Sequence, residues 1–321
     1  MSLVSIVIPM YNEARHIART LKAARLAAEV AGLDCELVVV DNGSSDEGPR
    51  IARDLGARVL RLPGLAIGAL RNQGARASKG EWLAFLDADI EVPQEWLSRL
   101  LVLHGEGQGD VFALDCDTPR QAPWFAYAWQ RRTLRAGRQV QTSNWLPTPN
   151  LLMQRSWFDR VDGFDERLRT GEDKDFTLRL GQAGARLCVL RKPVVLHWGF
   201  EASWGEWLGK ELWRQGSHLQ LLRSNGLSLR LLRFPLLSLA IWLFDLLALS
   251  LLAGGNGRGA LAALLVGALP ALGLSLRQSL KHRDPLFILQ LWMLHWLRLH
   301  LAGSALLLSL FNRTARRPAR G

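Results

Sequence analysis

The first 90 residues alternate between short apolar runs and helical patterns, and this alternation restricts the fold more than any other feature of the sequence. Strand patterns occupy residues 4–8, 36–40, 58–62 and 82–86, of which the first and the last are the apolar runs. Segments with helical patterns separate them, at residues 17–24, 51–55 and 69–78. Strands that alternate with helices at this spacing pair in parallel, with helices on both faces of the sheet. We therefore expect an α/β fold with a doubly wound, mostly parallel sheet.

Acidic side chains follow the ends of these predicted strands. Glu13 follows the first strand, Asp41 the second, and Asp87 and Asp89 the fourth. The carboxyl ends of neighbouring parallel strands share one edge of the sheet, and α/β folds bind ligands at that edge. We expect these carboxylates to line one crevice.

The tripeptide Asp87-Ala88-Asp89 closes the apolar run 82–86. Side chains alternate along a strand, so the two carboxylates point to the same side. Such a pair suits Mg²⁺ or Mn²⁺, because these cations keep coordination positions for water and phosphate oxygens. For the tripeptide alone, the alternative is a solvated acidic turn. Arg71, in the glycine-containing segment 68–74, could contact a phosphate or a carboxylate, or lie on a solvated helix face.

Four motifs occur in a fixed order: Pro9-Met10-Tyr11-Asn12-Glu13, residues 40–46, Arg71-Asn72-Gln73-Gly74 and Asp87-Ala88-Asp89. Together they resemble the nucleotide-sugar domain of family 2 glycosyltransferases, which has a GT-A fold, over about residues 3–215. The resemblance implies that Glu13 and Asp41 bind the base and ribose of a nucleotide diphosphate sugar, Asp87 the ribose or the metal, and Asp89 the metal. The full set of nucleotide-sugar-binding residues that we predict is Pro9, Tyr11, Glu13, Asp41, Ser44, Arg71, Asp87 and Ala88.

The pair Glu172-Asp173 opens a predicted helix and matches the Glu-Asp motif of that family. Carboxylates at a helix N-terminus are stabilised by the helix dipole, so the pair could merely cap the helix. The resemblance implies a catalytic role, because the Asp of this motif is the usual base in inverting members. An acceptor hydroxyl that attacks the anomeric carbon must lose a proton, and a carboxylate can accept it. We predict Asp173 as the base with Glu172 beside it, and Asn150 as a diphosphate or acceptor contact.

Three further polar residues complete the predicted site. His197 ends the apolar run 194–197, where some relatives use a histidine to bind metal or phosphate; a packed strand-end histidine is the alternative. Lys210 and Arg214 lie four residues apart on a predicted helix and could contact the diphosphate, a lipid phosphate or solvent. The sequence lacks the Gln-x-x-Arg-Trp motif of processive family members, which argues against polymer synthesis.

The C-terminal third has a different composition. Residues 211–321 contain 13 Lys and Arg but only 3 Asp and Glu, and they include the apolar runs 234–253 and 259–276. A 20-residue helix spans about 30 Å, enough to cross a bilayer. Basic residues among apolar runs favour an anionic membrane surface over nucleic acid as the partner. Basic flanks place both ends of this pair in the cytoplasm, and Asp245 should face protein rather than lipid.

Residues 285–311 are harder to assign. The basic tail 312–321 should stay on the cytoplasmic side, which a single third crossing would not allow. We expect a hairpin over 234–276 followed by an interfacial or re-entrant segment, with a third span or a buried soluble helical domain as alternatives. The predicted organisation is a GT-A domain (1–215), a basic amphipathic juxtamembrane linker (216–233), membrane helices (234–311) and a basic tail (312–321).

The sequence shows no signal-peptide pattern at its start, and its three cysteines are widely spaced, so we expect reduced thiols and a first domain in the cytoplasm, for example at the bacterial inner membrane. The combined prediction is a membrane-anchored, metal-dependent, inverting, non-processive glycosyltransferase. It would move one sugar from a nucleotide diphosphate sugar to a lipid-linked or glycan acceptor. The alternatives are a polyprenyl-phosphate sugar synthase and a membrane-bound nucleotide-sugar-binding partner without turnover.

Overall fold

The computed structural model describes residues 2–134, 137–168, 171–212, 229–279 and 284–311. The chain forms two compact units, one made of residues 1–119 and 134–199, the other of residues 120–133 and 200–321. Residues 120–133 therefore pack in the second unit, although they lie within the stretch predicted to form the GT-A domain. The predicted domain limits at 215, 233 and 311 stay predictions. Most of the predicted linker and the whole basic tail lie outside the described residues.

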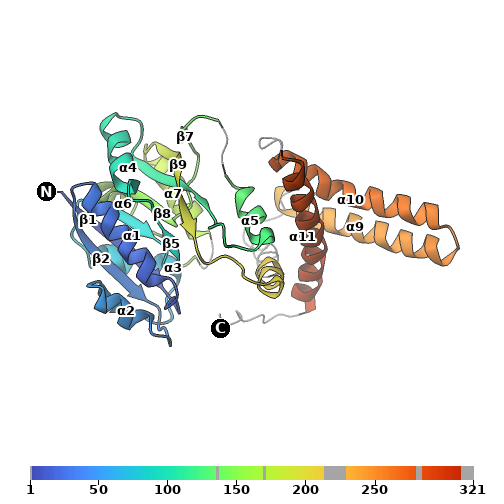
Figure 1. The fold of residues 1–321 in the computed structure, drawn as a ribbon, viewed down its shortest axis with the longest axis horizontal. Helices are drawn as coiled ribbons and strands as arrows, with labels where there is room; N and C mark the ends of the chain where they lie inside the picture. The colour runs from blue at the N-terminus through green and yellow to red at the C-terminus, as the bar shows by residue number, and fades with distance from the viewer. Residues whose placement is uncertain (1, 135–136, 169–170, 213–228, 280–283, 312–321) are drawn as a thin grey trace. The chain divides into compact units, whose positions relative to one another are not determined.

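One half of the sheet in the first unit is parallel (Figure 1). Its strands, in the spatial order β3-β2-β1-β4, are β1 (Leu3–Met10), β2 (Asp34–Asp41), β3 (Arg58–Arg61) and β4 (Trp82–Leu86). The connecting helices are α1 (Ile17–Val30), α2 (Gly48–Asp54) and α3 (Ile67–Arg76). These strands and helices coincide with the predicted alternation, which is confirmed for this half.

The other half of the sheet mixes strand directions. Its strands are β5 (Ile90–Glu91), β6 (Val111–Asp117), β7 (Val140–Thr142), β8 (Asn150–Gln154) and β9 (Leu187–His197). Over the described residues the nine strands form one sheet in the order β3-β2-β1-β4-β8-β6-β9-β5, with β7 beside β9. The sheet is mixed because β8 enters between β4 and β6 and runs antiparallel to both, whereas β6 and β9 are parallel.

Helices cover both faces of the sheet, as the alternation of side chains along β1 requires. Val4, Ile6 and Ile8 face the core that α1 and α4 (Trp96–Gly105) cover. Val7 faces the opposite core, which includes residues of α3, α6 (Arg155–Arg160) and α7 (Glu172–Gln182). On that side α3 approaches β1 closely, because a Cβ on Gly74 would lie 2.3 Å from Cγ1 of Val7. This contact fixes the position of α3 on the sheet.

The second unit is helical. It contains α5 (Trp124–Arg131), the helical residues 204–212, α9 (Leu229–Ala253), α10 (Gly257–Ser279) and α11 (Pro285–Phe311). Helices α9 and α10 form a hairpin, and α11 runs across it (Figure 1). Aromatic side chains join α5 to residues 204–212, since the ring centroids of Trp129 and Trp207 lie 5.4 Å apart.

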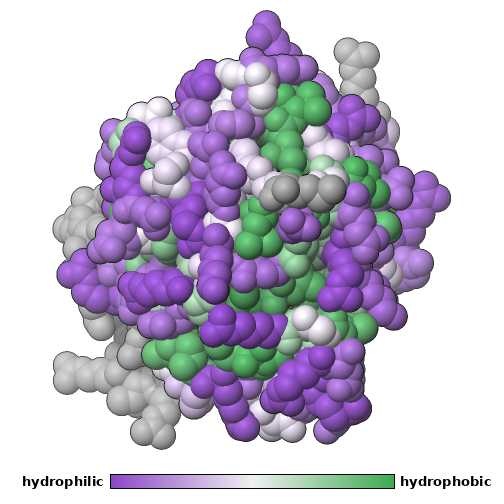
Figure 2. Space-filling model, turned by 90° about the vertical axis from the view of Figure 1, so that its left-hand side faces the viewer, coloured by the Kyte–Doolittle hydropathy of each residue, from purple (hydrophilic) through white to green (hydrophobic). Residues whose placement is uncertain are grey.

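The α9–α10 hairpin has the length and composition of membrane helices. The most apolar stretch of 18 residues has a mean hydropathy of 2.3 in α9, at residues 236–253, and of 2.0 in α10. Large apolar side chains on the hairpin are exposed, for example Leu243 at 67%. The face of the molecule seen in Figure 2 is instead mostly hydrophilic, with a band of hydrophobic residues crossing it. Asp245 lies within the apolar stretch of α9, and its Oδ2 is 2.9 Å from Nε2 of His300 on α11, so it faces protein as expected.

Candidate active site

Two loops at the carboxyl edge of the sheet are joined by hydrogen bonds. Asp41, at the end of β2, is 1% exposed, and its Oδ1 accepts a hydrogen bond from the amide of Ser44 at 2.9 Å. Oγ of Ser44 accepts one from the amide of Asn12, in the loop after β1, also at 2.9 Å. Asn12 has φ 55°, a left-handed conformation that asparagine tolerates better than most residues. The loops after β1 and β2 are therefore held together.

The second carboxylate oxygen of Asp41 is available to a ligand. Oδ2 of Asp41 is buried and makes no hydrogen bond within the described residues, and its nearest cation is Arg61, with Nε 3.8 Å away. A buried carboxylate oxygen without a donor is costly, because it has lost its hydration. The geometry suits an N–H or O–H donor on a bound molecule.

Three other residues that we predict to bind the nucleotide lie in β1 or in the loop that follows it. Pro9 is buried in β1, where its register partner is Val40. Tyr11, just beyond β1, is 40% exposed. The carbonyl of Glu13 accepts the amide hydrogen bonds that start α1. All three lie at the same carboxyl edge as Asp41.

Arg71 on α3 links two distant motifs. Its side chain is almost fully buried, with Nη2 donating to Oδ1 of Asp87 at 2.9 Å and Nη1 donating to Oε1 of Glu172 at 3.0 Å. Of the contacts predicted for Arg71, the carboxylate contact is the one observed. A buried guanidinium persists only when it is paired, so this bridge fixes the strand end at Asp87 against the start of α7.

Asp173 lies in the first turn of α7, next to Glu172. The helix begins after Gly171, which has φ 76°. Burial raises the pKa of Asp173 above its ordinary value and the charge of Glu172 adds to the shift, while the amide of Lys174, 2.7 Å from Oδ1, opposes it. A carboxylate with a raised pKa is a better proton acceptor near neutral pH than an exposed one.

The tripeptide at the end of β4 occupies the middle of this site. Burial raises the pKa of Asp87, the neighbouring charge of Asp89 adds to the shift, and the Arg71 guanidinium opposes it. Ala88, between them, is 4% exposed, and its carbonyl accepts a hydrogen bond from Oγ1 of Thr20 on α1 at 2.8 Å. This buried contact of Thr20 is not evident from the sequence, because a threonine within a helix gives no sign of a partner on another element.

Asp89 and His197 lie together at the open end of the tripeptide. Oδ2 of Asp89 is 3.1 Å from Nε2 of His197, and the antiparallel pairing of β5 with β9 brings them together by setting Ile90 opposite His197. A Cβ on Gly199 would lie only 2.0 Å from Oδ2 of Asp89, so the absent side chain leaves room for the carboxylate.

This donor set fits a hard divalent cation that keeps several non-protein ligands. Asp89 offers carboxylate oxygens and His197 an imidazole nitrogen, and a nucleotide diphosphate would add phosphate oxygens. Within the described residues, no group of three or more His, Cys, Asp or Glu side chains is arranged to hold a metal. The protein would therefore supply few of the ligands itself.

Of the three remaining predicted residues, Asn150 lies at the start of β8, opposite Leu86, the residue before Asp87. Both polar groups of Asn150 are engaged by the backbone of Leu114: Oδ1 accepts from its amide at 2.6 Å, and Nδ2 donates to its carbonyl at 3.2 Å. This contact ties β8 to β6. Lys210 belongs to the second unit, where its Nζ is 2.7 Å from Oε1 of Glu201. Arg214 lies outside the described residues.

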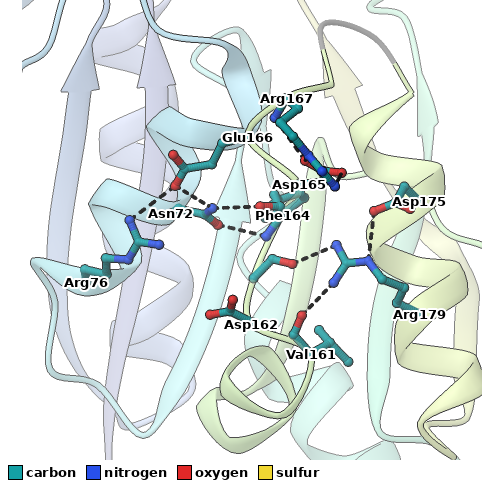
Figure 3. A pocket seen from close by; sticks show the side chains of 11 residues that line it. Asn72, Arg76, Val161, Asp162, Phe164, Asp165, Glu166, Arg167, Asp175 and Arg179 are labelled. Carbon is teal, nitrogen blue, oxygen red and sulfur yellow. Dashed lines mark hydrogen bonds and ion pairs between the residues drawn. The ribbon is translucent and has the colours of Figure 1, made fainter.

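Asn72, next to Arg71, has a role that the sequence analysis missed. Its Nδ2 donates to the carbonyl of Phe164, and its Oδ1 accepts from the amide of Phe164, both at 2.8 Å (Figure 3). Arg179 of α7 donates to the carbonyls of Val161 and Gly163 in the same loop. The loop borders an open cavity of about 540 Å³ and leads toward α7. Helix α3 thus positions the start of α7 through Arg71, and the loop before α7 through Asn72.

A parallel sheet half that ends in acidic loops, beside a mixed half, defines a GT-A type nucleotide-sugar fold. The model of the family described as "Glycosyl transferase family 2" matches residues 5–164. The chain therefore belongs to the family 2 glycosyltransferases, as its four ordered motifs predict.

Named relatives agree with this family. The chain is 31% identical over 205 residues to the glycosyltransferase AglE of Haloferax volcanii, a match covering 60% of this chain and 66% of that protein. It is 35% identical over 133 residues to the undecaprenyl-phosphate 4-deoxy-4-formamido-L-arabinose transferase of Edwardsiella ictaluri, covering 38% and 39%. The matches thus span less than two thirds of the length of these relatives.

A solved structure shows the same fold. The mannosyltransferase PcManGT from Pyrobaculum calidifontis, solved in complex with GDP-Man and Mn²⁺, is similar with a TM-score of 0.56. The similarity covers 97% of this chain and 88% of that protein, at 17% sequence identity. At this identity the likeness concerns the fold alone.

Proposed function

We propose that the chain is a membrane-anchored, metal-dependent, inverting, non-processive glycosyltransferase. It would take a sugar from a nucleotide diphosphate sugar and pass it to a lipid-linked or glycan acceptor. The observation that carries the proposal is the Arg71 bridge, with 2.9 Å to Asp87 and 3.0 Å to Glu172. Through this bridge, the strand end that faces the donor and the helix start that carries the base belong to one rigid cluster.

The proposed reaction uses Asp173 as the base. Its carboxylate accepts the proton of an acceptor hydroxyl, and the hydroxyl oxygen forms a bond to the anomeric carbon from the face opposite the leaving group. The bond between that carbon and the diphosphate oxygen breaks, and the diphosphate leaves with the electron pair. A single displacement of this kind inverts the anomeric configuration. The raised pKa of Asp173 suits the role of proton acceptor.

The negative charge of the departing diphosphate needs compensation. We propose that Asp89 and His197 hold Mg²⁺ or Mn²⁺ for this purpose, with Asp87 held beside them by Arg71. When bound, such a cation supplies positive charge to the diphosphate oxygens. On the nucleotide side, we propose that Asp41 receives a donor group of the base, with Pro9, Tyr11, Glu13, Ser44 and Ala88 around it.

The α9–α10 hairpin supports membrane anchoring. Its exposed leucines match the bilayer interior, and its basic flanks favour the cytoplasm for both ends. We propose that the catalytic unit works on the cytoplasmic side, where lipid-linked acceptors and nucleotide sugars meet. Lys210 and Arg214 remain candidates for a lipid-phosphate or diphosphate contact.

A second candidate function is transfer directly to a polyprenyl phosphate. It is favoured by the 35% identity to a relative named as an undecaprenyl-phosphate sugar transferase. The nucleophile would then be a phosphate oxygen that is already anionic, so Asp173 would have no proton to remove. This difference separates the two functions by experiment.

The test uses the purified full chain in nanodiscs with labelled UDP-, GDP- and dTDP-sugars, Mg²⁺ or Mn²⁺, and two acceptors, a polyprenyl phosphate and a lipid-linked saccharide. Label in the lipid extract is expected with one donor and one acceptor class, and none is expected with EDTA. The product should have the inverted anomeric configuration by NMR. Retention would contradict the single displacement, and nucleotide-sugar binding without transfer to any acceptor would support the binding-partner alternative.

A further inference from the structure

One face of α11 is apolar and exposed. We call the four side chains Leu286, Leu289, Met293 and Trp296 the α11 stripe; their exposed fractions are 63%, 55%, 39% and 37%. Spacings of three and four residues place them on one side of the helix. Large apolar side chains in such an array are uncommon on a surface that faces water.

The opposite face of α11 packs on the part of the second unit that lies outside the hairpin. Phe287, Leu291 and Leu294 are buried against α5 and residues 204–212. Each residue turns a helix by about 100°, so Met293 lies about 200° around the helix from Leu291. The α11 stripe therefore points away from α5.

The charged side chain of Arg298 lies on that same buried side. Nε of Arg298 is 3.4 Å from Oε2 of Glu211, whose Oε1 accepts a hydrogen bond from Nε1 of Trp129 at 3.0 Å. Glu211 is 1% exposed. If α11 crossed the bilayer, this ionic contact and α5 would be carried toward the hydrocarbon, where charged groups are costly.

The third side of α11 lies against the hairpin. Nε1 of Trp292 donates to the carbonyl of Ala268, and Oγ of Ser275 donates to the carbonyl of Ile288, so α11 meets the later half of α10. His300, on the turn after Trp296, is satisfied by Asp245 of α9. Helix α11 thus runs across α9 and α10 rather than alongside them (Figure 1). If the hairpin stands upright in a bilayer, a helix across it lies in the membrane plane.

We infer that α11 is an in-plane membrane helix whose stripe enters the boundary between headgroups and acyl chains of one leaflet. α5 and residues 204–212 stay on its water side. The occupant is lipid because the stripe adjoins the exposed apolar surface of two helices long enough to span a bilayer, and because Trp296 suits the interfacial depth. The inference rests on the membrane anchoring proposed above and is independent of the sugar-transfer chemistry.

The test measures the depth of single positions in a bilayer. In a full-length chain with Cys35, Cys116 and Cys188 replaced by alanine, one new cysteine at a time is labelled with bimane at position 286, 289, 293 or 296. Quenching by lipids that carry a doxyl group at different depths then locates each label in phosphatidylcholine–phosphatidylglycerol vesicles. Exposed Leu243 on α9 serves as the deep control, and Leu178 on α7, 38% exposed, as the water control.

We expect all four labels at one shallow depth, within a few ångströms of each other, and the Leu243 label near the bilayer centre. A spanning α11 would instead give a depth change of about 15 Å between positions 286 and 296, since a helix rises about 1.5 Å per residue, and would overturn the inference. A deep Leu243 label with an unquenched stripe would also overturn it, because protein would then cover the stripe. An unquenched Leu243 label would overturn the anchoring itself, whatever the transfer assay shows.

A second measurement needs no cysteine replacement. An in-plane α11 begins and ends on the same side, so a reporter fused after Gly321 should be active on the side of the catalytic unit. Activity on the opposite side alone would overturn the inference.

Discussion

The carboxyl edge of the sheet and the α9–α10 hairpin differ in how much charge they carry. In the first unit, charged side chains gather at the carboxyl edge of the sheet and enter the interior in close contact, as Arg71 does between Asp87 and Glu172. In the second unit, charged groups are few along the hairpin, and exposed leucines such as Leu243 replace them. In the proposed function, the first unit carries out sugar transfer and the second unit anchors the protein to a membrane. A substitution in the first unit should then leave membrane attachment unchanged, and a substitution in the second unit should leave nucleotide-sugar binding unchanged.

The largest expected effect is at the base. Asp173→Asn should lower kcat by about 10²–10⁴-fold with a hydroxyl acceptor, because the amide cannot accept the proton. The matched control is Asp175→Asn, in the same turn of α7, whose partner is Arg179 at 2.9 Å; it should stay within a few-fold of the original rate. Steady-state transfer assays measure both. Equal rates for the two variants with a hydroxyl acceptor would remove Asp173 from the mechanism, whereas an unaffected rate with polyprenyl phosphate alone fits an anionic nucleophile.

The second effect concerns the buried bridge in the first unit. Arg71→Met should lower the free energy of unfolding by about 3–5 kcal/mol, because it leaves the carboxylates of Asp87 and Glu172 without their cation. Arg50→Met is the control: Arg50 is also 2.9 Å from a carboxylate, that of Asp54, but the pair is exposed to water. Exposed pairs contribute little, so this variant should unfold like the original. Chemical denaturation followed by fluorescence compares them, and similar losses in both would show that burial does not matter here.

The third effect tests the second unit with two leucines of α11. Leu291 is fully buried and Leu289 is 55% exposed. Leu291→Ala should cost about 2–5 kcal/mol of stability by leaving a cavity, whereas Leu289→Ala should leave the thermal unfolding of the detergent-solubilised protein nearly unchanged. In both variants the first unit should still bind nucleotide sugar. If Leu289→Ala destabilised the protein as much as Leu291→Ala did, the stripe would be a packed surface rather than an exposed one.

The smallest effect is a pH dependence in the first unit. Because burial raises the pKa of Asp173, the base loses its charge at a higher pH than an exposed aspartate would. The rate kcat/KM should therefore fall on the acidic side, starting above the ordinary aspartate range near pH 3.9. The pH profile in the presence of a hydroxyl acceptor measures this limb. A limb that persists unchanged in Asp173→Asn would belong to another group.

The elements of the parallel sheet half could be predicted from the sequence, because local patterns determine them. The runs at 4–8 and 82–86 are apolar apart from Ser5, and the strands found there are buried. The antiparallel insertion of β8 between β4 and β6 could not be predicted, because strand order depends on contacts between distant segments. For the same reason, the packing of residues 120–133 in the second unit could not be predicted.

The contacts of single side chains in the site could also be predicted only in part. Asp41, Asp87 and Asp89 lie at strand ends because the motif spacing determines their place, whereas the partners of Asn150 and Asn72 depend on the fold. Asn150 is predicted to contact the diphosphate or the acceptor, yet its amide group is engaged by the backbone of Leu114. Asn72 belongs to one of the four motifs without a predicted role, yet it holds the loop at Phe164. A polar side chain reveals its role only through the atoms around it.

The absence of a side chain at Gly199 makes the contact between Asp89 and His197 sensitive to substitution at this position. A methyl group there would displace the carboxylate of Asp89, which can turn about its own bonds, so Gly199→Ala should leave the fold intact while breaking the contact with His197. The defect of this variant would be seen in the amount of product formed and not in the amount of folded protein.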